Sequence, residues 1–502
     1  MARLTLLYPR WTGSYSIFGH FARRNSQWPP LNLSLLGAVA EQTGHETKII
    51  DAEVEGFDAE QLAKKAVESK PDVIGLCAYS PFYHLSADVA AAIKKINKDV
   101  PVILGGPHVT IVKEQAMQPQ FDFLFQGEAE RTLPLFLEEF SNGRDFSKIR
   151  GLIYHSKTGE IVNNGEPNWL SEVSMKKSDL GKNYPLDDLP LPARHLLPMR
   201  KYRLGTMQGR THFSSIQSSR GCYWACIFCA SDAIKTRRIL MKSPRRVVEE
   251  MCDVVGKFPF IMHFYIVDDV LLFWPEHILE IADRMDAAGL RVTFEGSTRA
   301  NTVTEPIIKR LAKSGLVRLS FGLETIDPKM RETMGKKIPV EFYPKANRIC
   351  QEYGVEPLNS LMIGLPGETP ETIKATIEWV RAQRDISQAN VAIAMPYPGT
   401  EFSEMALDGT HGVELLSKDF GKYLRYGSAV TRVNGMEPQE LVDWQNWAFV
   451  RIYSAHWRWL PVIRKHGILG FLMQMVRVLR LWKKRLLKWS PLQPVMRHPK
   501  ET

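Results

Sequence analysis

The sequence predicts an α/β protein made of two parallel-sheet domains and an α-helical C-terminal tail. Short apolar runs alternate with helical patterns in residues 1–150 and again in residues 211–405. Such alternation is typical of parallel sheets, whose strands need long crossover connections. Five runs in the first series predict a doubly wound Rossmann-like or flavodoxin-like domain, and six strand–helix units in the second predict a partial TIM-type (β/α)6 barrel. Residues 406–502 carry helical patterns and no strand signal.

The first domain, residues 1–150, is expected to bind a ligand at one edge of its sheet. Its predicted strands are 4–8, 46–50, 73–77, 102–104 and 123–125, and its predicted helices are 31–42, 59–69, 85–97 and 131–140. Ligands of doubly wound sheets bind outside the carboxyl ends of the strands. The candidate binding residues at those ends are Asp51, Tyr79, Ser80, Gly105, Gly106, His108, Gly127 and Glu128.

The connection, residues 151–210, separates the two domains. A hairpin with a turn at Gly159 comes first, and a proline-rich stretch at 184–194 follows. Because prolines at this density stop helices and stiffen a chain, we predict the domain boundary here.

The second domain, residues 211–405, is expected to gather polar side chains into one cavity. Its predicted strands are 213–217, 262–267, 292–295, 318–321, 357–363 and 389–394, and the helices between them are 244–255, 275–288, 305–314, 340–353 and 370–383. The chemistry of such barrels lies at the carboxyl ends of the strands. Candidate residues at or just after these ends are Asp268, Asp269, Glu295, Ser297, Arg299, Glu324 and Gly364.

Cys222, Cys226 and Cys229 follow the first predicted strand of this barrel, and Phe228 stands before the last of them. Three thiolates so close together suit a metal or an iron–sulfur cluster, because an odd number does not pair into disulfides. A zinc site is the alternative, but it usually needs a second cysteine pair or histidines. A cubane held by three cysteines leaves one iron open for another ligand.

This C-x3-C-x2-C loop, with its aromatic residue before the last cysteine, resembles the signature of the radical SAM superfamily. The resemblance implies a [4Fe-4S] cluster on Cys222, Cys226 and Cys229 and S-adenosylmethionine on the open iron. It also implies a 5′-deoxyadenosyl radical and an external electron donor of flavodoxin or ferredoxin type.

The barrel's polar residues match what S-adenosylmethionine requires. A carboxylate accepts from the ammonium or the ribose hydroxyls, and Arg299 pairs with the carboxylate. By resemblance these residues correspond to strand motifs of the family. Asp268-Asp269 replaces the more usual Gly-Gly-Glu, so either acid is a candidate for the amino group. The expected contacts are Phe228, Asp268, Asp269, Glu295, Ser297, Arg299, Glu324 and Gly364.

In order and spacing, residues 1–150 resemble the cobalamin-binding domain that precedes many radical SAM enzymes. The matching positions are Pro29–Leu31, Gly44–His45, Asp51, Gly105–His108 and Gly127–Glu130. The Asp-x-His-x-x-Gly loop that supplies a cobalt ligand in other cobalamin enzymes is absent. Either cobalamin binds without a protein ligand below cobalt, or the domain has become a structural or substrate-binding module. His84 and His108 are near-cobalt candidates or ordinary loop histidines. Residues 10–27 form a long loop, either a cover over a corrin or substrate or a surface loop packed by Trp11 and Phe18.

The charge distribution argues against nucleic acid. The net charge is +10, but residues 451–502 hold twelve Lys and Arg and one acid, and the other 450 residues hold 53 basic and 54 acidic residues. A diffuse basic surface is therefore not predicted. Cysteine is sparse, which indicates a reducing, cytoplasmic setting.

The tail predicts an amphipathic helix over 467–490. Apolar residues recur there every three or four positions, with Lys and Arg largely on the opposite face. This composition suits a helix lying on a membrane surface, and the alternative is a helix packed on the barrel.

The sequence and its resemblances lead to one functional hypothesis with two alternatives. We expect a cobalamin-dependent radical SAM enzyme that C-methylates an unactivated carbon of a small hydrophobic substrate: a lipid, terpenoid or tetrapyrrole. Oxidative cyclisation or ring contraction is the alternative reaction. A non-catalytic corrinoid or iron–sulfur sensor is the alternative from another class.

Overall fold

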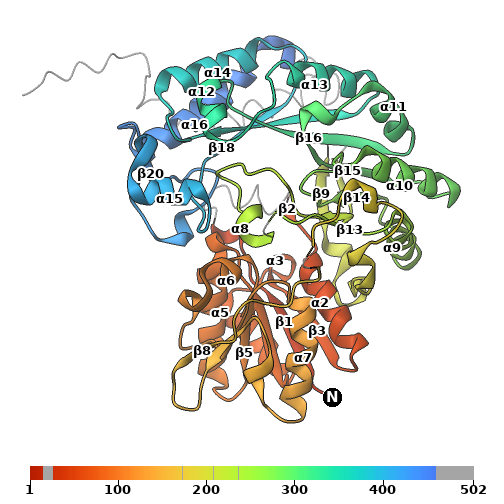
Figure 1. The fold of residues 1–502 in the computed structure, drawn as a ribbon, viewed down its shortest axis with the longest axis vertical. Coiled ribbons are helices and arrows are strands. Elements are labelled where there is room, and N and C mark those ends of the chain that lie inside the picture. The colour runs from red at the N-terminus through yellow and green to blue at the C-terminus, as the bar shows by residue number, and fades with distance from the viewer. Residues whose placement is uncertain (15–25, 172, 207–208, 236, 460–502) are drawn as a thin grey trace, which may run out of the picture.

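The computed structural model of the chain describes residues 1–502 except 15–25, 172, 207–208, 236 and 460–502. Figure 1 shows the N-terminal domain below and the arc of the barrel above, with the carboxyl ends of the N-terminal strands directed at the barrel. Residues that follow the N-terminal strands therefore lie on the side of that domain that faces the barrel.

The N-terminal sheet confirms the doubly wound prediction. Its five parallel strands lie in the order β3-β1-β4-β5-β6, which is the 2-1-3-4-5 order of flavodoxin-like folds. The strands are β1 (Arg3–Tyr8), β3 (Glu46–Asp51), β4 (Val73–Cys77), β5 (Val102–Gly105) and β6 (Phe123–Phe125). The helices are α2 (Leu31–Gln42), α3 (Ala52–Glu55), α4 (Ala59–Glu68), α5 (Tyr83–Ile96), α6 (Pro107–Val112) and α7 (Ala129–Ser141).

The chain switches direction between β1 and β4, which places a topological switch point beside Tyr8 and Cys77. One face of the sheet packs Leu6 and Ile103 against α2 and α7, while the other packs Leu7 and Leu76 against α4 and α5. Ligands of such sheets bind at the switch point.

The sheet extends past residue 150. The hairpin β7 (Leu152–His155) and β8 (Ile161–Asn163) joins it, because β7 pairs antiparallel with β6. The sequence placed this hairpin in the connection, but periodicity alone does not say which sheet edge a hairpin joins.

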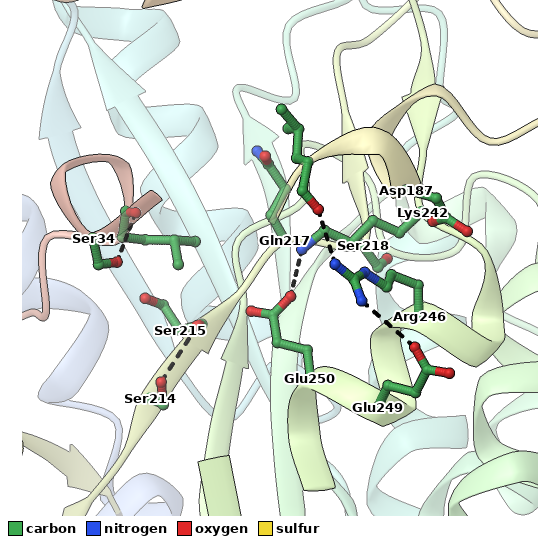
Figure 2. A network of polar contacts seen from close by, with 12 residues as sticks. Ser34, Asp187, Ser214, Ser215, Gln217, Ser218, Lys242, Arg246, Glu249 and Glu250 are labelled. Carbon is green, nitrogen blue, oxygen red and sulfur yellow. Dashed lines mark hydrogen bonds and ion pairs between the residues drawn. The ribbon is translucent and has the colours of Figure 1, made fainter. Parts of the chain in front are cut away.

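The proline-rich connection is fixed to the barrel by a buried ionic network. Arg194 donates to the Glu250 carboxylate at 2.6 Å and to the backbone oxygen of Ser215 at 2.7 Å. Lys242 donates to the other carboxylate oxygen of Glu250 at 2.5 Å, and Figure 2 shows this contact. Burial acts to raise the pKa of Glu250, but the positive charges and hydrogen bonds of Lys242 and Arg194 together have the larger effect. The pKa of Glu250 is therefore below its usual value. Because breaking a buried pair leaves an uncompensated charge, this network holds the connection in one position.

The barrel confirms the second predicted sheet. Six parallel strands lie in the order β11-β14-β15-β16-β17-β18, and the first does not pair with the last, so the barrel is partial. The strands are β11 (Ser214–Ile216), β14 (His263–Ile266), β15 (Thr293–Thr298), β16 (Leu316–Glu324), β17 (Glu356–Ile363) and β18 (Ala389–Ile393). The helices are α9 (Pro244–Lys257), α10 (Pro275–Ala287), α11 (Glu305–Lys313), α12 (Pro328–Thr333), α13 (Phe342–Glu352) and α14 (Pro370–Ala382).

Shorter elements complete the region between the domains. One small sheet contains β2 (Ser26–Gln27), β9 (Arg203–Thr206) and β10 (Gly209–His212). The pair β12 (Ser219–Arg220) and β13 (Leu240–Met241) brackets the cysteine loop, and α8 (Ser231–Lys235) follows the last cysteine.

The C-terminal region contains α15 (Glu401–Asp408), α16 (Pro438–Tyr453) and an antiparallel pair, β19 (Val413–Leu415) and β20 (Thr431–Val433). The expectation of no strand after residue 406 was wrong, because three-residue strands carry too few residues for a periodic signal. Within the described residues no helix is both long and apolar enough to cross a membrane. The amphipathic helix predicted over 467–490 lies outside the described residues.

Candidate functional site

The cysteine loop lies between β12 and α8, at the carboxyl end of β11. All three of its cysteines are free and partly exposed. The Cys229 amide donates to the Cys226 carbonyl at 2.9 Å, which folds the second half of the loop into a turn. In the part of the chain that the structure describes, no group of three or more His, Cys, Asp and Glu side chains closes on a single metal ion.

Asp268 fixes the chain just before the loop. Its carboxylate accepts from the backbone N–H groups of Ser218 and Ser219 at 2.8 and 3.0 Å, and from both hydroxyls. Burial raises its pKa, and these four hydrogen bonds oppose that rise. The carboxylate is therefore occupied by the protein's own donors.

Asp269 holds both ends of the loop. It accepts from the Gly221 N–H on one side of the cysteines and from the Ser231 hydroxyl on the other, each at 3.0 Å. An irregular loop lacks the ladder hydrogen bonds of a strand, so other acceptors must satisfy its backbone donors: the Asp269 carboxylate for Gly221, and backbone carbonyls for Ile227 and Cys229. The two adjacent acids thus determine where the loop lies.

Two cations approach the middle cysteine. Arg299 lies over the Trp224 ring at 4.0 Å, and Lys336 pairs with Glu324 at 2.8 Å. Burial raises the pKa of the Cys226 thiol, whereas the charges of Lys336 and Arg299 act to lower it. Burial also raises the pKa of Cys222, to about 11. Nearby cations favour a thiolate and any anionic cluster built on it.

The other candidates from the barrel are placed differently. Glu295 lies within β15 rather than after it, and its buried carboxylate meets Arg318 at 3.1 Å and His263 at 3.7 Å. Gly364 donates its N–H to Glu368, and Phe228 packs at the margin of the hydrophobic core. Ser297 hydrogen-bonds Tyr265 from the adjacent strand.

A cavity of about 480 Å³ lies where the domains meet. Its deep part is an apolar slot between the N-terminal sheet and helices α2 and α7, lined by Leu6, Ile103 and Leu133. Gln217 and Arg220 line the cavity from the barrel side. Because Arg220 stands two residues before Cys222, the cavity adjoins the cysteine loop.

This cavity brings together five of the eight candidate residues of the N-terminal domain. Those lining it are Tyr79, Gly105, Gly106, Gly127 and Glu128. Gly106 has φ +102°, and a Cβ there would lie 2.7 Å from the Cys77 sulfur, so packing within the protein already requires this glycine.

Asp51, Ser80 and His108 do not line the cavity. Asp51 caps α3 and accepts from the Tyr202 hydroxyl at 2.7 Å, and its burial raises its pKa to about 7. His108 shares a hydrogen bond with Ser80 at 3.0 Å and packs edge-on against Phe420 of the C-terminal region. Burial lowers the pKa of His108 to about 4, which keeps the ring neutral. His84 lies against Gly421 in the same contact region.

Sequence reasoning missed two cations of the site. Lys336 follows a glycine and precedes another lysine, a pattern typical of a solvated turn. Arg220 stands two residues before Cys222 but pairs with Glu128, 92 residues away. Its place inside the cysteine motif was the one available signal.

Two family descriptions match successive parts of this architecture. The B12 binding domain matches residues 20–137, and the radical SAM superfamily matches residues 216–380. The chain belongs to the radical SAM superfamily and carries an N-terminal B12-binding domain. A [4Fe-4S] cluster, S-adenosylmethionine and cobalamin are the cofactors of this pairing of domains.

Three named relatives cover most of the chain. The uncharacterised methyltransferase PH0819 of Pyrococcus horikoshii is 32% identical over 79% of this chain and 81% of its own. The hopanoid C-3 methylase of Methylococcus capsulatus is 26% identical over 90% and 82%. The anaerobic magnesium-protoporphyrin IX monomethyl ester cyclase of Rubrivivax gelatinosus is 24% identical over 88% and 75%.

The fold also matches a solved structure. The radical S-adenosylmethionine methyltransferase TsrM of Kitasatospora setae, solved with cobalamin and a [4Fe-4S] cluster, superposes with a TM-score of 0.67. The match covers 91% of this chain and 89% of TsrM at 18% identity. The arrangement of the two domains is therefore shared by both proteins.

The residues present fit these cofactors. The loop offers three free thiols on a backbone fixed by Asp269, with Arg299 and Lys336 beside Cys226 to balance negative charge. Cobalamin combines a corrin ring bearing amide side chains with a nucleotide tail, and the cavity lining combines apolar residues with polar side chains such as Glu128, Gln217 and Arg220. A few polar groups in a largely apolar lining are typical of cofactor sites.

Proposed function

We propose that the chain is a cobalamin-dependent radical SAM methyltransferase that methylates an unactivated carbon of a hydrophobic small molecule. One observation carries this proposal: the cysteine loop and the cavity of the B12-binding domain meet at Arg220, so both cofactor sites face one interface. Cys222, Cys226 and Cys229 would hold a cluster that would supply the electron for reductive cleavage of S-adenosylmethionine, and the cavity would hold a corrinoid that would carry the transferred methyl group.

Cys222, Cys226 and Cys229 hold the cluster in this proposal. We propose that Arg299, with Lys336 beside it, binds the carboxylate of S-adenosylmethionine, because both cations lie near Cys226. Asp268 and Asp269 hold the loop in this proposal. The other contacts proposed for S-adenosylmethionine are Phe228, Glu295, Ser297, Glu324 and Gly364. Those proposed for cobalamin are the five cavity-lining residues Tyr79, Gly105, Gly106, Gly127 and Glu128. Asp51, Ser80 and His108, the other three predicted from the sequence, do not line the cavity, and we assign them to the support of its walls.

Two of the relatives support a hydrophobic substrate. Their names give a hopanoid and a magnesium porphyrin as substrates, both of them polycyclic and poorly soluble. We assign this chain a substrate of that class: a lipid, terpenoid or tetrapyrrole. Oxidative cyclisation is the second candidate reaction, because the cyclase matches 88% of this chain.

The cellular setting follows from the chemistry. All six cysteines are free, which suits a reducing cytoplasm and an electron donor of flavodoxin or ferredoxin type. We further propose peripheral membrane contact through residues 467–490. Deletion of 467–502 should lower recovery with liposomes in flotation, and unchanged recovery would contradict this contact.

Anaerobic reconstitution with iron and sulfide, followed by S-adenosylmethionine and dithionite, tests the enzyme. We expect 5′-deoxyadenosine from the wild type, and none from single alanine variants at Cys222, Cys226 and Cys229. A spectroscopically intact cluster that yields no 5′-deoxyadenosine would favour a non-catalytic sensor. With substrate, co-production of S-adenosylhomocysteine identifies methyl transfer, whereas its absence beside a new ring identifies the cyclase.

A further inference from the structure

Arg220 connects the two domains through a buried charge cluster. Its NH1 donates to Glu128 at 2.6 Å and its NH2 to Glu130 at 2.9 Å, both across the domain interface. Its Nε and NH2 also donate to Gln217 on its own side, at 3.3 and 3.2 Å. The side chains of Arg220, Glu128 and Glu130 are only 12%, 12% and 10% exposed, so the contacts are shielded from solvent.

The chain between Arg220 and the first cysteine is stiff. Arg220 pairs with Leu240 in the short ladder of β12 and β13. Gly221 has φ +103°, its N–H is bound by Asp269, and a Cβ on it would lie 1.7 Å from the Arg238 carbonyl oxygen. A displacement of Arg220 is therefore passed on to Cys222 rather than absorbed between them.

Glu128, at the N-terminal side of the Arg220 charge cluster, is also held rigidly. The second oxygen of Glu128 accepts from the Leu170 N–H at 2.7 Å. Gly127 donates to the Thr110 hydroxyl at 3.0 Å and packs against Pro167. Glu128 is thus fixed relative to the cavity that it lines together with Arg220, Glu130 and Gln217.

Contacts other than the Arg220 charge cluster also hold the chain together across this region. Arg194 ties the connection to Glu250, and Phe420 packs on His108 at a separate place in the interface. A buried ion pair adds little stability over apolar packing, but removal of one partner leaves an uncompensated buried charge.

We propose that Arg220 is a positioning residue that fixes the cysteine loop to the wall of the cavity, so that filling the cavity changes the surroundings of the cluster. This rests on the proposed function, because it requires that the loop hold a cluster and the cavity a corrinoid. Arg220 acts here through the loop and not on a reacting atom.

The test compares electron paramagnetic resonance spectra of the reduced, reconstituted protein with and without hydroxocobalamin, and measures the corrinoid Kd by absorbance. In the wild type we expect the corrinoid to shift the cluster signal. Arg220→Gln should take up iron at the wild-type level, lose that shift and raise the corrinoid Kd about tenfold or more. Arg220→Lys, which keeps one charge-assisted contact, should restore part of the shift.

Arg310→Gln is the matched control. Arg310 also joins two carboxylates, Asp283 at 2.6 Å and Asp286 at 3.0 Å, but on the outer helices of the barrel. Arg310→Gln should show the wild-type change of the cluster signal. An equal loss of that change in Arg310→Gln would mean that the loss in Arg220→Gln comes from general destabilisation, and it would overturn the proposal. Glu130→Gln removes one partner with little change of shape and should weaken the shift even if Arg220→Gln does not fold.

These outcomes distinguish a failure of the proposed function from a failure of the role assigned to Arg220. A wild type that binds neither cluster nor corrinoid refutes the proposed function and this inference with it. A wild type that binds both, with the same spectral shift in Arg220→Gln or with no shift at all, overturns only the role of Arg220.

Discussion

The two walls of the inter-domain cavity are held by different kinds of contact. On the N-terminal side, the turns at Gly106 and Gly127 are fixed by close packing, with side-chain and backbone atoms of Cys77, Ala78 and Pro167 where a Cβ would lie. On the barrel side, the cysteine loop is fixed by carboxylates that accept its backbone N–H groups.

The difference follows from what each wall contains. The N-terminal turns are short links between strands and helices, and close packing fixes them together with a hydrogen bond from the Gly127 N–H to Thr110. The cysteine loop is irregular, and some of its backbone donors need side-chain acceptors because no ladder supplies them. Steric changes should therefore affect one cofactor site at a time, while changes at shared contacts should affect both.

Gly221→Ala should have the largest effect. Its Cβ would lie 1.7 Å from the Arg238 carbonyl oxygen at φ +103°, so the backbone must move, and we expect a loss of more than about 4 kcal/mol in local stability. Iron content after reconstitution should fall close to zero, while the corrinoid Kd should rise no more than in Arg220→Gln, because the packed N-terminal wall is unchanged. Gly256→Ala, with open space around a helical glycine, is the control and should be neutral or slightly stabilising. Normal iron uptake by Gly221→Ala would refute the steric argument.

Gly127→Ala should have the opposite pattern. A Cβ at φ +67° would lie 2.4 Å from Pro167, and the wall that carries Glu128 must shift, at a cost of roughly 3 kcal/mol. Iron content should stay near the wild-type level while the corrinoid Kd rises, as measured by absorbance titration. If both variants lost the same cofactor, the two walls would not be independent.

Asp51→Asn tests the N-terminal domain away from the cavity. Burial raises the pKa of Asp51 from 3.8 to about 7, so its contribution to stability is complete below about pH 4 and is lost as the pH rises through 7. Relative to Asp51→Asn, the wild type should lose roughly 2 kcal/mol between pH 5 and 7, measured by urea unfolding. Tyr202→Phe removes a hydrogen bond that lowers this pKa and should move the midpoint upward. A pH-independent difference would contradict the burial of an ionisable carboxyl.

Tyr223→Phe should have the smallest effect. The ring is 40% exposed, and its hydroxyl donates to the Met175 carbonyl at 2.5 Å on the outer side of the loop. Loss of this hydrogen bond should cost roughly 0.5–1 kcal/mol and leave iron content unchanged, as shown by thermal unfolding and iron assay. A large loss of iron would mean that the outer contacts, and not Asp268 and Asp269, hold the loop.

The two sheets and the cysteine loop could be predicted from the sequence because these features depend on residues that are close together along the chain. Strand runs such as Val73–Cys77 and the spacing of the three cysteines are local patterns. The roles of Asp268 and Asp269 were not predictable, since an acid after a strand looks the same whether it faces a ligand or its own backbone. Arg220 and Glu128 are 92 residues apart, and only the packing of the domains brings them together.

A crystal structure of the protein loaded with both cofactors would show whether the two sites share one wall. We expect a cluster on Cys222, Cys226 and Cys229 and a corrinoid bound at the inter-domain cavity, with the wall of Arg220, Glu128 and Glu130 between them. A corrinoid bound elsewhere, or a cluster whose loop is detached from that wall, would contradict it.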